Sequence, residues 1–281
     1  MILRSADLNG PALNLLFIGD IVGKGGRKAV QALVPKLKQQ YMCTFVIANG
    51  ENCAAGAGMN QSCLREMDTV DVFTSGDHTW DRKEFEDEIR GMKNVVRPAN
   101  MSKLQPGRGW LYTRNPAGGE VAVISLMGKV FMKDSAYCPF ETAEQILTQI
   151  PITCKCIIVD IHAEATSEKA ALAWFLDGRV TAVLGTHTHV QTADARILPG
   201  GTAFLSDVGM VGAADSILGR AVPDVIAKFR TGMPHKFPVV ESGIRLDAAV
   251  VRYDMMSGRA LEIKPISVMC DTAGGAEAAF G

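Results

Sequence analysis

The chain has 281 residues, close to the upper limit for one hydrophobic core, so a single α/β domain is expected and two small domains are the alternative. Its apolar fraction of 47%, charged fraction of 21% and formal net charge of -1 are ordinary for a globular protein. This balance excludes a global field that would attract nucleic acid or an anionic membrane, although a bound metal can still attract a small phosphorylated substrate.

The sequence carries no signal for membrane insertion or secretion. No stretch approaches the run of about 20 apolar residues that a membrane-spanning helix needs. The first residues lack a basic region followed by an apolar core, so we expect no signal peptide. The seven cysteines are scattered and odd in number, which argues against disulfides and favours a cytoplasmic location.

Strand and helix patterns alternate along the first two-thirds of the chain. Continuous apolar runs bounded by turns are typical of strands buried on both faces. Such runs occur at 13–18, 44–48, 70–74, 121–126, 157–161, 182–185 and 202–206. Residues 1–12 precede the first strand and are expected to form a loose extension with a turn signal.

Helices are expected between these strands. Apolar residues at helical spacing predict one over 29–37, where Pro35 should cause a kink or a restart. Further helices are expected after the caps Asn60 and Thr166, after a capping box formed by Asp81 and Glu84, and over 141–150 and 225–230.

The last third of the chain favours antiparallel pairing. Residues 245–253 and 260–268 alternate around a turn at 256–258, which predicts a hairpin. No internal repeat or change of composition marks a linker. We therefore expect a layered α/β fold with helices outside and sheet within, as one domain over 13–270 followed by a flexible tail at 271–281.

Four of the five histidines lie where a predicted strand ends. His78 follows 70–74, His162 follows 157–161, and His187 and His189 follow 182–185. A lone histidine in such a place is most often a hydrogen-bonded structural residue. Four of them point to metal binding, because ligands gather beyond the carboxyl ends of the strands in α/β sheets.

Acidic and amide residues at the other strand ends complete the set of donors. Asp20 ends the first strand, Glu51 and Asn52 follow the second, and Asp77 precedes His78. Oxygen and imidazole donors of this kind suit iron, manganese or zinc. They are too many for one tetrahedral ion, and they fit a pair of ions a few ångström apart.

In this order the segments resemble the calcineurin-like metallophosphoesterases. Four strings are similar to one branch, the bacterial 2′,3′-cyclic-nucleotide 2′-phosphodiesterase family: IGDIVG at 18–23, ANGEN at 48–52, DIHAEATSEK at 160–169 and GTHTHVQTAD at 185–194. The resemblance extends from about residue 15 to 268. It implies a four-layer α/β/β/α sandwich, in which two packed mixed sheets are flanked by helices.

The resemblance also implies roles for the residues at the strand ends. Asp20 and His189 would hold one metal with help from Asn52, and Asp77, His162 and His187 would hold the other. Glu51 would bridge the two ions or touch each of them, and His78 would be the general acid beside the leaving oxygen. The family usually has Asn where this chain has Asp77, so we expect an additional negative charge, a less acidic metal-bound water or a firmer hold on a trivalent ion.

The function implied is a dinuclear metal-dependent phosphodiesterase that hydrolyses 2′,3′-cyclic nucleotides or related phosphodiesters by attack of a metal-bridging hydroxide. Iron is the first choice of metal, with manganese or zinc as alternatives. Two rival functions stay open: a phosphomonoesterase or nuclease on the same site, and a non-catalytic regulatory or RNA-associated metal-binding protein. Because the family tends to assemble, a homo-oligomer is expected, and no membrane partner is.

Weaker candidates have plainer alternatives. Arg97 and Arg108 can meet phosphate, although surface charge is the simpler interpretation. The loop at 206–212 is a substrate contact or a structural turn. Glu164 and Lys169 are expected to cap or pair locally. His235 is expected to be an exposed loop residue.

Overall fold

The computed structural model describes residues 11–133 and 136–270. The expected N-terminal extension, apart from its last two residues, and the expected tail at 271–281 lie outside these described residues. Within them, no helix is both long and apolar enough to cross a bilayer.

Two mixed β-sheets form the centre of the molecule. The first has the strand order β2-β11-β12-β1-β3-β4, with β13 paired to β12; its strands are β1 (Ala12–Ile18), β2 (Asp20–Ile21), β3 (Cys43–Asn49), β4 (Val72–Thr74), β11 (Met210–Ala213), β12 (Ile244–Asp254) and β13 (Ala260–Met269). The second has the order β5-β6-β7-β8-β10-β9; its strands are β5 (Trp110–Arg114), β6 (Glu120–Met127), β7 (Cys156–His162), β8 (Ala182–Thr186), β9 (Arg196–Ile197) and β10 (Ala203–Leu205).

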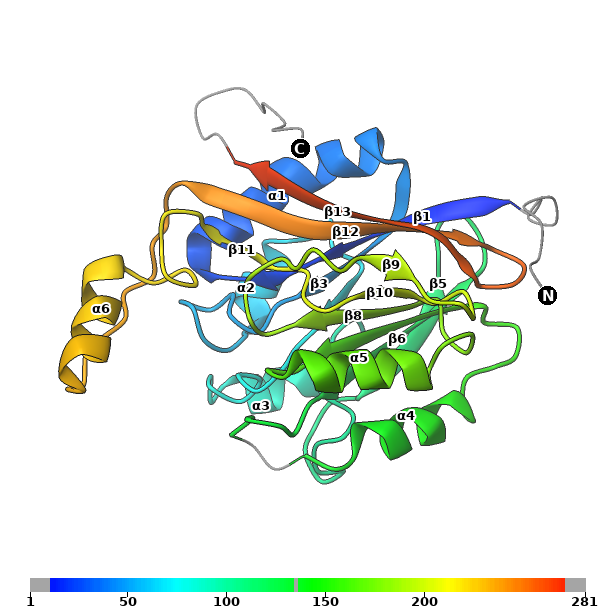
Figure 1. The fold of residues 1–281 in the computed structure, drawn as a ribbon, viewed down its shortest axis with the longest axis horizontal. Coiled ribbons are helices and arrows are strands. Elements are labelled where there is room, and N and C mark those ends of the chain that lie inside the picture. The colour runs from blue at the N-terminus through cyan, green and yellow to red at the C-terminus, as the bar shows by residue number, and fades with distance from the viewer. Residues whose placement is uncertain (1–10, 134–135, 271–281) are drawn as a thin grey trace.

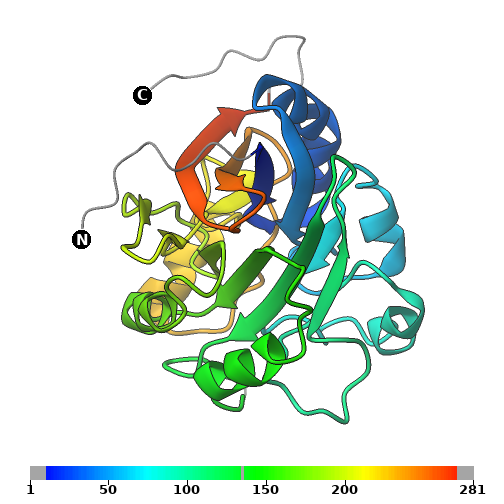
Figure 2. The ribbon, with the colours of Figure 1, turned by 90° about the vertical axis from the view of Figure 1, so that its right-hand side faces the viewer.

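Helices cover the outer faces of both sheets (Figures 1 and 2). The helices among the described residues are α1 (Gly23–Gln40), α2 (Gln61–Arg65), α3 (Phe85–Glu88) with the 3₁₀ turn η1 (Ile89–Gly91), α4 (Pro139–Leu147), α5 (Thr166–Phe175) and α6 (Val222–Thr231). α1 lies against the first sheet, and α4 and α5 lie against the second. α6 projects from the body at the left of Figure 1.

Three hydrophobic cores separate the four layers. Phe17 and Phe45 of the first sheet pack with Ile158 and Leu184 of the second in the middle core. A second core joins α1 to the outer face of the first sheet, and a third joins α4 and α5 to the outer face of the second. The predicted α/β/β/α sandwich is therefore confirmed. Its long strands read as continuous apolar runs because both of their faces are buried.

The structure corrects three local predictions. The expected restart at Pro35 does not occur: α1 continues as one helix across the proline, and Val30, Val34 and Leu37 pack in the same core on both sides of it. Thr166 is the first residue of α5 rather than its cap, which is Ala165.

The predicted capping box at Asp81 and Glu84 is also wrong. α3 begins only at Phe85, and the Asp81 carboxylate binds the ring of His78 instead. By contrast, the Asn60 side chain accepts a hydrogen bond from the Cys63 amide, as a cap of α2 should.

The parallel pairing of strands determines where the candidate site lies. β1, β3 and β4 are mutually parallel, as are β6, β7, β8 and β10 in the second sheet. Their carboxyl ends therefore point the same way within each sheet. The hairpin of β12 and β13 pairs in register over most of its length, as predicted, and supports β1 from the other side.

Candidate metal centre

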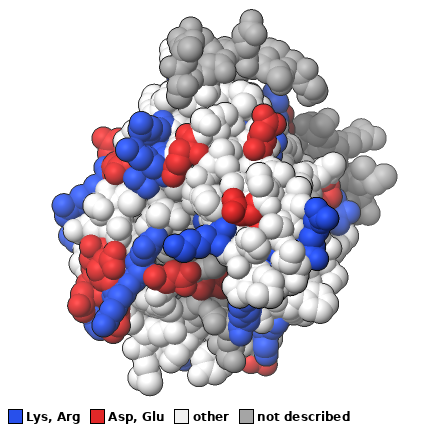
Figure 3. All heavy atoms as spheres, turned by 90° about the vertical axis from the view of Figure 1, so that its left-hand side faces the viewer, with Lys and Arg blue, Asp and Glu red and all other residues white. Residues whose placement is uncertain are grey.

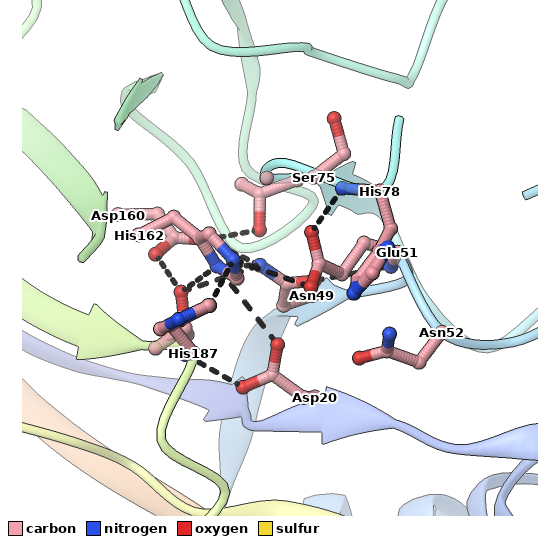
Figure 4. Close-up of polar contacts among 12 residues, drawn as sticks. Asp20, Asn49, Glu51, Asn52, Ser75, His78, Asp160, His162 and His187 are labelled. Carbon is pink, nitrogen blue, oxygen red and sulfur yellow. Dashed lines mark hydrogen bonds and ion pairs between the residues drawn. The ribbon is translucent and has the colours of Figure 1, made fainter. Parts of the chain in front are cut away.

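The predicted ligand residues come together where the two sheets meet (Figure 4). Asp20 begins β2, while Glu51 and Asn52 follow β3 in the first sheet. His162 ends β7, and His187 follows β8 in the second sheet. Asp20 and His187, which are 167 positions apart in the chain, thus face one centre.

Four side chains form the closest cluster. The possible ligand atoms of Glu51, Asp77, His162 and His187 all lie within 4.8 Å of one another. His162 Nε2 is 3.0 Å from Asp77 Oδ1, 3.2 Å from Glu51 Oε1 and 3.0 Å from His187 Nδ1. Two imidazoles and two carboxylates at this spacing are a donor set that borderline metal ions accept.

Asp20 lies beside this cluster and is fully buried. Its Oδ2 accepts a hydrogen bond from the His187 amide at 3.1 Å. Its Oδ1 is 3.9 Å from His162 Nδ1 and has no hydrogen-bond partner among the described residues. A buried carboxylate oxygen without a partner is costly unless a cation binds it, so the site fits a metal.

Asn52 and His189 form a separate pair at the edge of the site. Asn52 Oδ1 lies 3.1 Å from His189 Nε2, and His189 Nδ1 lies 3.3 Å from the carbonyl oxygen of Leu218. Loss of solvent lowers the pKa of His189 to about 4, so the ring is neutral at physiological pH, the form in which imidazole ligates metals.

Burial and the charges of neighbouring side chains shift the pKa values of the cluster residues in opposite directions. Burial raises the pKa of Asp20 well above its ordinary value, against the opposing effect of His162. Burial alone would lower the pKa of His162, but the carboxylates of Glu51 and Asp77 raise it well above the usual range. Burial alone would raise the pKa of Glu51 and of Asp77, but their contacts with His162 lower both. The carboxylates thus favour a positive charge at this centre, which a metal ion could supply in place of the proton on His162.

A buried network that the sequence did not indicate orients His162. Thr186 Oγ1 lies 2.9 Å from His162 Nδ1 and donates to Asp160 Oδ1 at 2.7 Å. Asn49 and Thr74 donate to the other oxygen of Asp160. With Nδ1 engaged in this way, Nε2 is the atom that faces the cluster.

His78 stands on the solvent side of the cluster. Its backbone amide donates to Glu51 Oε2 at 3.3 Å, and its ring Nδ1 lies 2.7 Å from Asp81 Oδ2. The side chain is 37% exposed, so a substrate can reach it. Because Asp81 holds Nδ1, any proton transfer to a substrate would use Nε2.

Of the weaker candidates, Arg97 differs from the sequence interpretation, whereas Arg108 and His235 agree with it. The guanidinium of the buried Arg97 donates to the carbonyl oxygens of Pro98, Ser102, Gln105 and Pro106, so it holds a loop and is engaged away from phosphate. Arg108 and His235 are exposed.

Glu164 and Lys169 do not pair locally as expected. Glu164 Oε2 lies 3.2 Å from His187 Nε2, across the ring from the cluster, while Lys169 pairs with the distant Asp207. The loop at 206–212 contains the start of β11, a strand that its glycines concealed from the sequence pattern.

The comparisons with known proteins agree with this geometry. The sequence profile of the YmdB-like protein family matches residues 16–266. The chain belongs to this family. The chain is 44% identical over 261 residues to the 2′,3′-cyclic-nucleotide 2′-phosphodiesterase of Bacillus subtilis, covering 92% of this chain and 98% of that protein. Family membership confirms the resemblance and the enzyme class predicted from the sequence, a phosphoesterase.

Two solved structures share the fold of this YmdB-like chain. A novel phosphatase from Mycoplasma pneumoniae superposes with a TM-score of 0.86 at 30% identity, covering 92% of this chain and 94% of that one. A hypothetical protein from Thermus thermophilus superposes with a TM-score of 0.85 at 38% identity, covering 92% of this chain and 99% of that one.

A glycine beside the cluster provides a test of its close packing. A Cβ atom at Gly76 would lie 2.1 Å from the ring of His162, so Gly76→Ala should displace this ring and lower the affinity for Mn²⁺ by at least about tenfold. Isothermal titration of metal-free protein measures this. Gly91→Ala is the matched control, since nothing lies within 4 Å of a Cβ there. Equal affinities in the two variants would show that His162 is not a ligand.

Proposed function

We propose that this YmdB-like protein is a dinuclear metal-dependent phosphodiesterase that hydrolyses 2′,3′-cyclic nucleotides or related phosphodiesters. The observation that carries the proposal is the cluster of Glu51, Asp77, His162 and His187, with the unpartnered, buried oxygen of Asp20 beside it. The activity in the name of the Bacillus subtilis relative supplies the substrate class.

The geometry supports a division of the ligands between two ions. Asp77, His162 and His187 would hold one ion, and Asp20 and His189 the other. Glu51 would lie between them, and Asn52, in contact with His189, would assist the second ion. Iron is our first choice of metal because carboxylate and imidazole donors accept it, with manganese and zinc as alternatives.

The chain's own residues supply orientation and a proton. When bound, the metal pair would supply positive charge to the phosphoryl oxygens and lower the pKa of a water molecule. His78 would donate a proton from Nε2 to the leaving ribose oxygen, since Asp81 occupies Nδ1. The hydrogen bond from the His78 amide to the Glu51 carboxylate holds the proposed acid in place relative to the ligand cluster.

A small substrate suits the protein better than a long nucleic acid. Figure 3 views the side from which α6 projects, and basic and acidic side chains are interspersed on it. The formal net charge of -1 adds no attraction for a polyanion. RNA as a substrate and a phosphomonoesterase activity, which the named phosphatase from Mycoplasma pneumoniae favours, remain rivals to be tested.

Two further proposals concern the cellular location and the oligomeric state of the enzyme. We propose a reducing cytoplasm as its location, because the buried cysteines are free thiols: Cys43, Cys53, Cys63, Cys154 and Cys156. We also propose a homo-oligomer, because the exposed apolar residues of α6, Val222, Ile226 and Phe229, offer a surface that association would bury.

A substrate panel tests the reaction class. Protein loaded with Mn²⁺ or Fe²⁺ should hydrolyse 2′,3′-cyclic AMP and bis-p-nitrophenyl phosphate faster than mononucleotides or RNA, and chelation should abolish this activity reversibly. Elemental analysis on the same sample should find two ions per chain. Loaded protein without activity on any phosphoester would leave only a metal-binding role.

Substitution of His78 should lower the activity without removing metal, unlike substitution of a metal ligand. His78→Ala is expected to lower kcat about 10²- to 10⁴-fold, the usual contribution of a general acid, while the metal content stays unchanged. His235→Ala, at an exposed loop residue, is the control and should behave as wild type. Loss of an ion from the His78 variant would make His78 a ligand and refute its role as the acid.

Asp77, which stands where the family usually has asparagine, should change the metal selectivity and the pH dependence of the site. Asp77→Asn removes one negative charge next to His162 and His187, so Fe³⁺ should be retained less firmly relative to Mn²⁺. The acid limb of the pH–rate profile should move to lower pH. Profiles and metal selectivity identical to those of wild type would show that this charge is without effect.

A further inference from the structure

Both histidines of the His187-x-His189 segment have unusual backbone conformations. His187 has a φ of 102° and His189 a φ of 63°, in the region that favours glycine. A side chain in this region costs free energy, and such residues persist only where the surroundings hold them. Contacts outside the two rings must therefore fix this segment.

Two hydrogen bonds hold the backbone on either side of His187. Lys169 Nζ donates to the carbonyl oxygen of Thr186 at 2.8 Å, immediately before this histidine. The amide of Thr188, immediately after it, donates to Asp207 Oδ2 at 3.0 Å. One charged group thus holds each side of the residue.

The two gripping groups form an ion pair. Lys169 Nζ lies 2.8 Å from Asp207 Oδ2, and the residues are 0% and 1% exposed. Lys169 comes from α5, and Asp207 follows β10, so the pair joins an outer helix to the sheet. The other oxygen of Asp207 accepts from the Gly209 amide at 2.9 Å, which fixes the carboxylate in turn.

Stability alone does not account for a pair buried this completely. Removing two charges from water offsets most of their attraction, and an apolar pair of similar volume is often at least as stable. What an apolar pair cannot supply is a donor for the Thr186 carbonyl and a charged acceptor for the Thr188 amide. The specific use of the pair therefore lies in the conformation of the segment between them.

We propose that Lys169 and Asp207 are positioning residues that fix the His187-x-His189 backbone so that both imidazoles enter the metal centre. Both act through the backbone, at the Thr186 carbonyl and the Thr188 amide. The proposal rests on the metal centre of the proposed function. It does not depend on which phosphoester is hydrolysed.

The main test uses a double substitution, Lys169→Met with Asp207→Asn, which removes both charges and keeps the side-chain volumes. We expect metal-free protein to unfold within a few degrees of wild type. We expect the affinity for Mn²⁺, measured by isothermal titration, to fall about 10- to 100-fold, as is usual when outer partners of metal ligands are lost. The absorption spectrum of the Co²⁺-loaded variant should also change, because the imidazole geometry has changed.

The matched control removes an exposed ion pair. Arg179→Met with Glu144→Gln breaks a pair whose side chains are 40% and 54% exposed, and it should leave affinity and spectrum unchanged. If the Lys169 and Asp207 variant binds Mn²⁺ as wild type does, with the same Co²⁺ spectrum, the pair is only structural and the proposal is overturned.

A measurement on the wild-type protein covers the case in which the double variant does not fold. Hydrogen exchange of the Thr188 amide in metal-free protein should be as slow as that of the central strands, because Asp207 holds it. Free exchange would overturn the proposal. The proposed function fails separately, if loaded wild type binds two ions but hydrolyses no cyclic nucleotide.

Discussion

The structure depends on one electrostatic constraint: three carboxylates, those of Asp20, Glu51 and Asp77, converge on the buried ring of His162. Like charges at this spacing cannot all be ionised in a poorly solvated place unless a cation compensates them. The carboxylates of Glu51, Asp77 and Asp20 accordingly raise the pKa of His162 well above its usual range. A metal pair would compensate these charges more completely, because ions bind several oxygens at once.

The two-sheet sandwich brings these carboxylates and His162 together. The ligands come from both sheets, so the middle core that joins the sheets also determines the distance between ligand sets. Local contacts then orient the individual ligand side chains. Gly76 admits the ring of His162, the Asp160 network turns that ring, and the Lys169 and Asp207 pair holds the next strand end. The middle core thus sets the distance between the two ligand sets, and these local contacts set the orientation of the individual side chains.

The sequence predicted what is periodic or adjacent in the chain. Buried strands appear as apolar runs, and the donors follow them directly, so the layers and the convergence of Asp20, Glu51 and His162 were foreseeable. Asp160 and Asp207 were not, since a single polar residue shows no pattern and its partners lie up to 111 positions away. The capping box at Asp81 failed because its carboxylate had a nearer partner in His78, which only the folded turn reveals.

Anomalous diffraction from crystals grown with Mn²⁺ tests the central claim most directly. The account predicts two peaks about 3.5–4 Å apart. One should lie against Asp77, His162 and His187, the other against Asp20 and His189, with Glu51 between them. A single peak, or peaks away from these side chains, would contradict a dinuclear centre built on the ends of the two sheets.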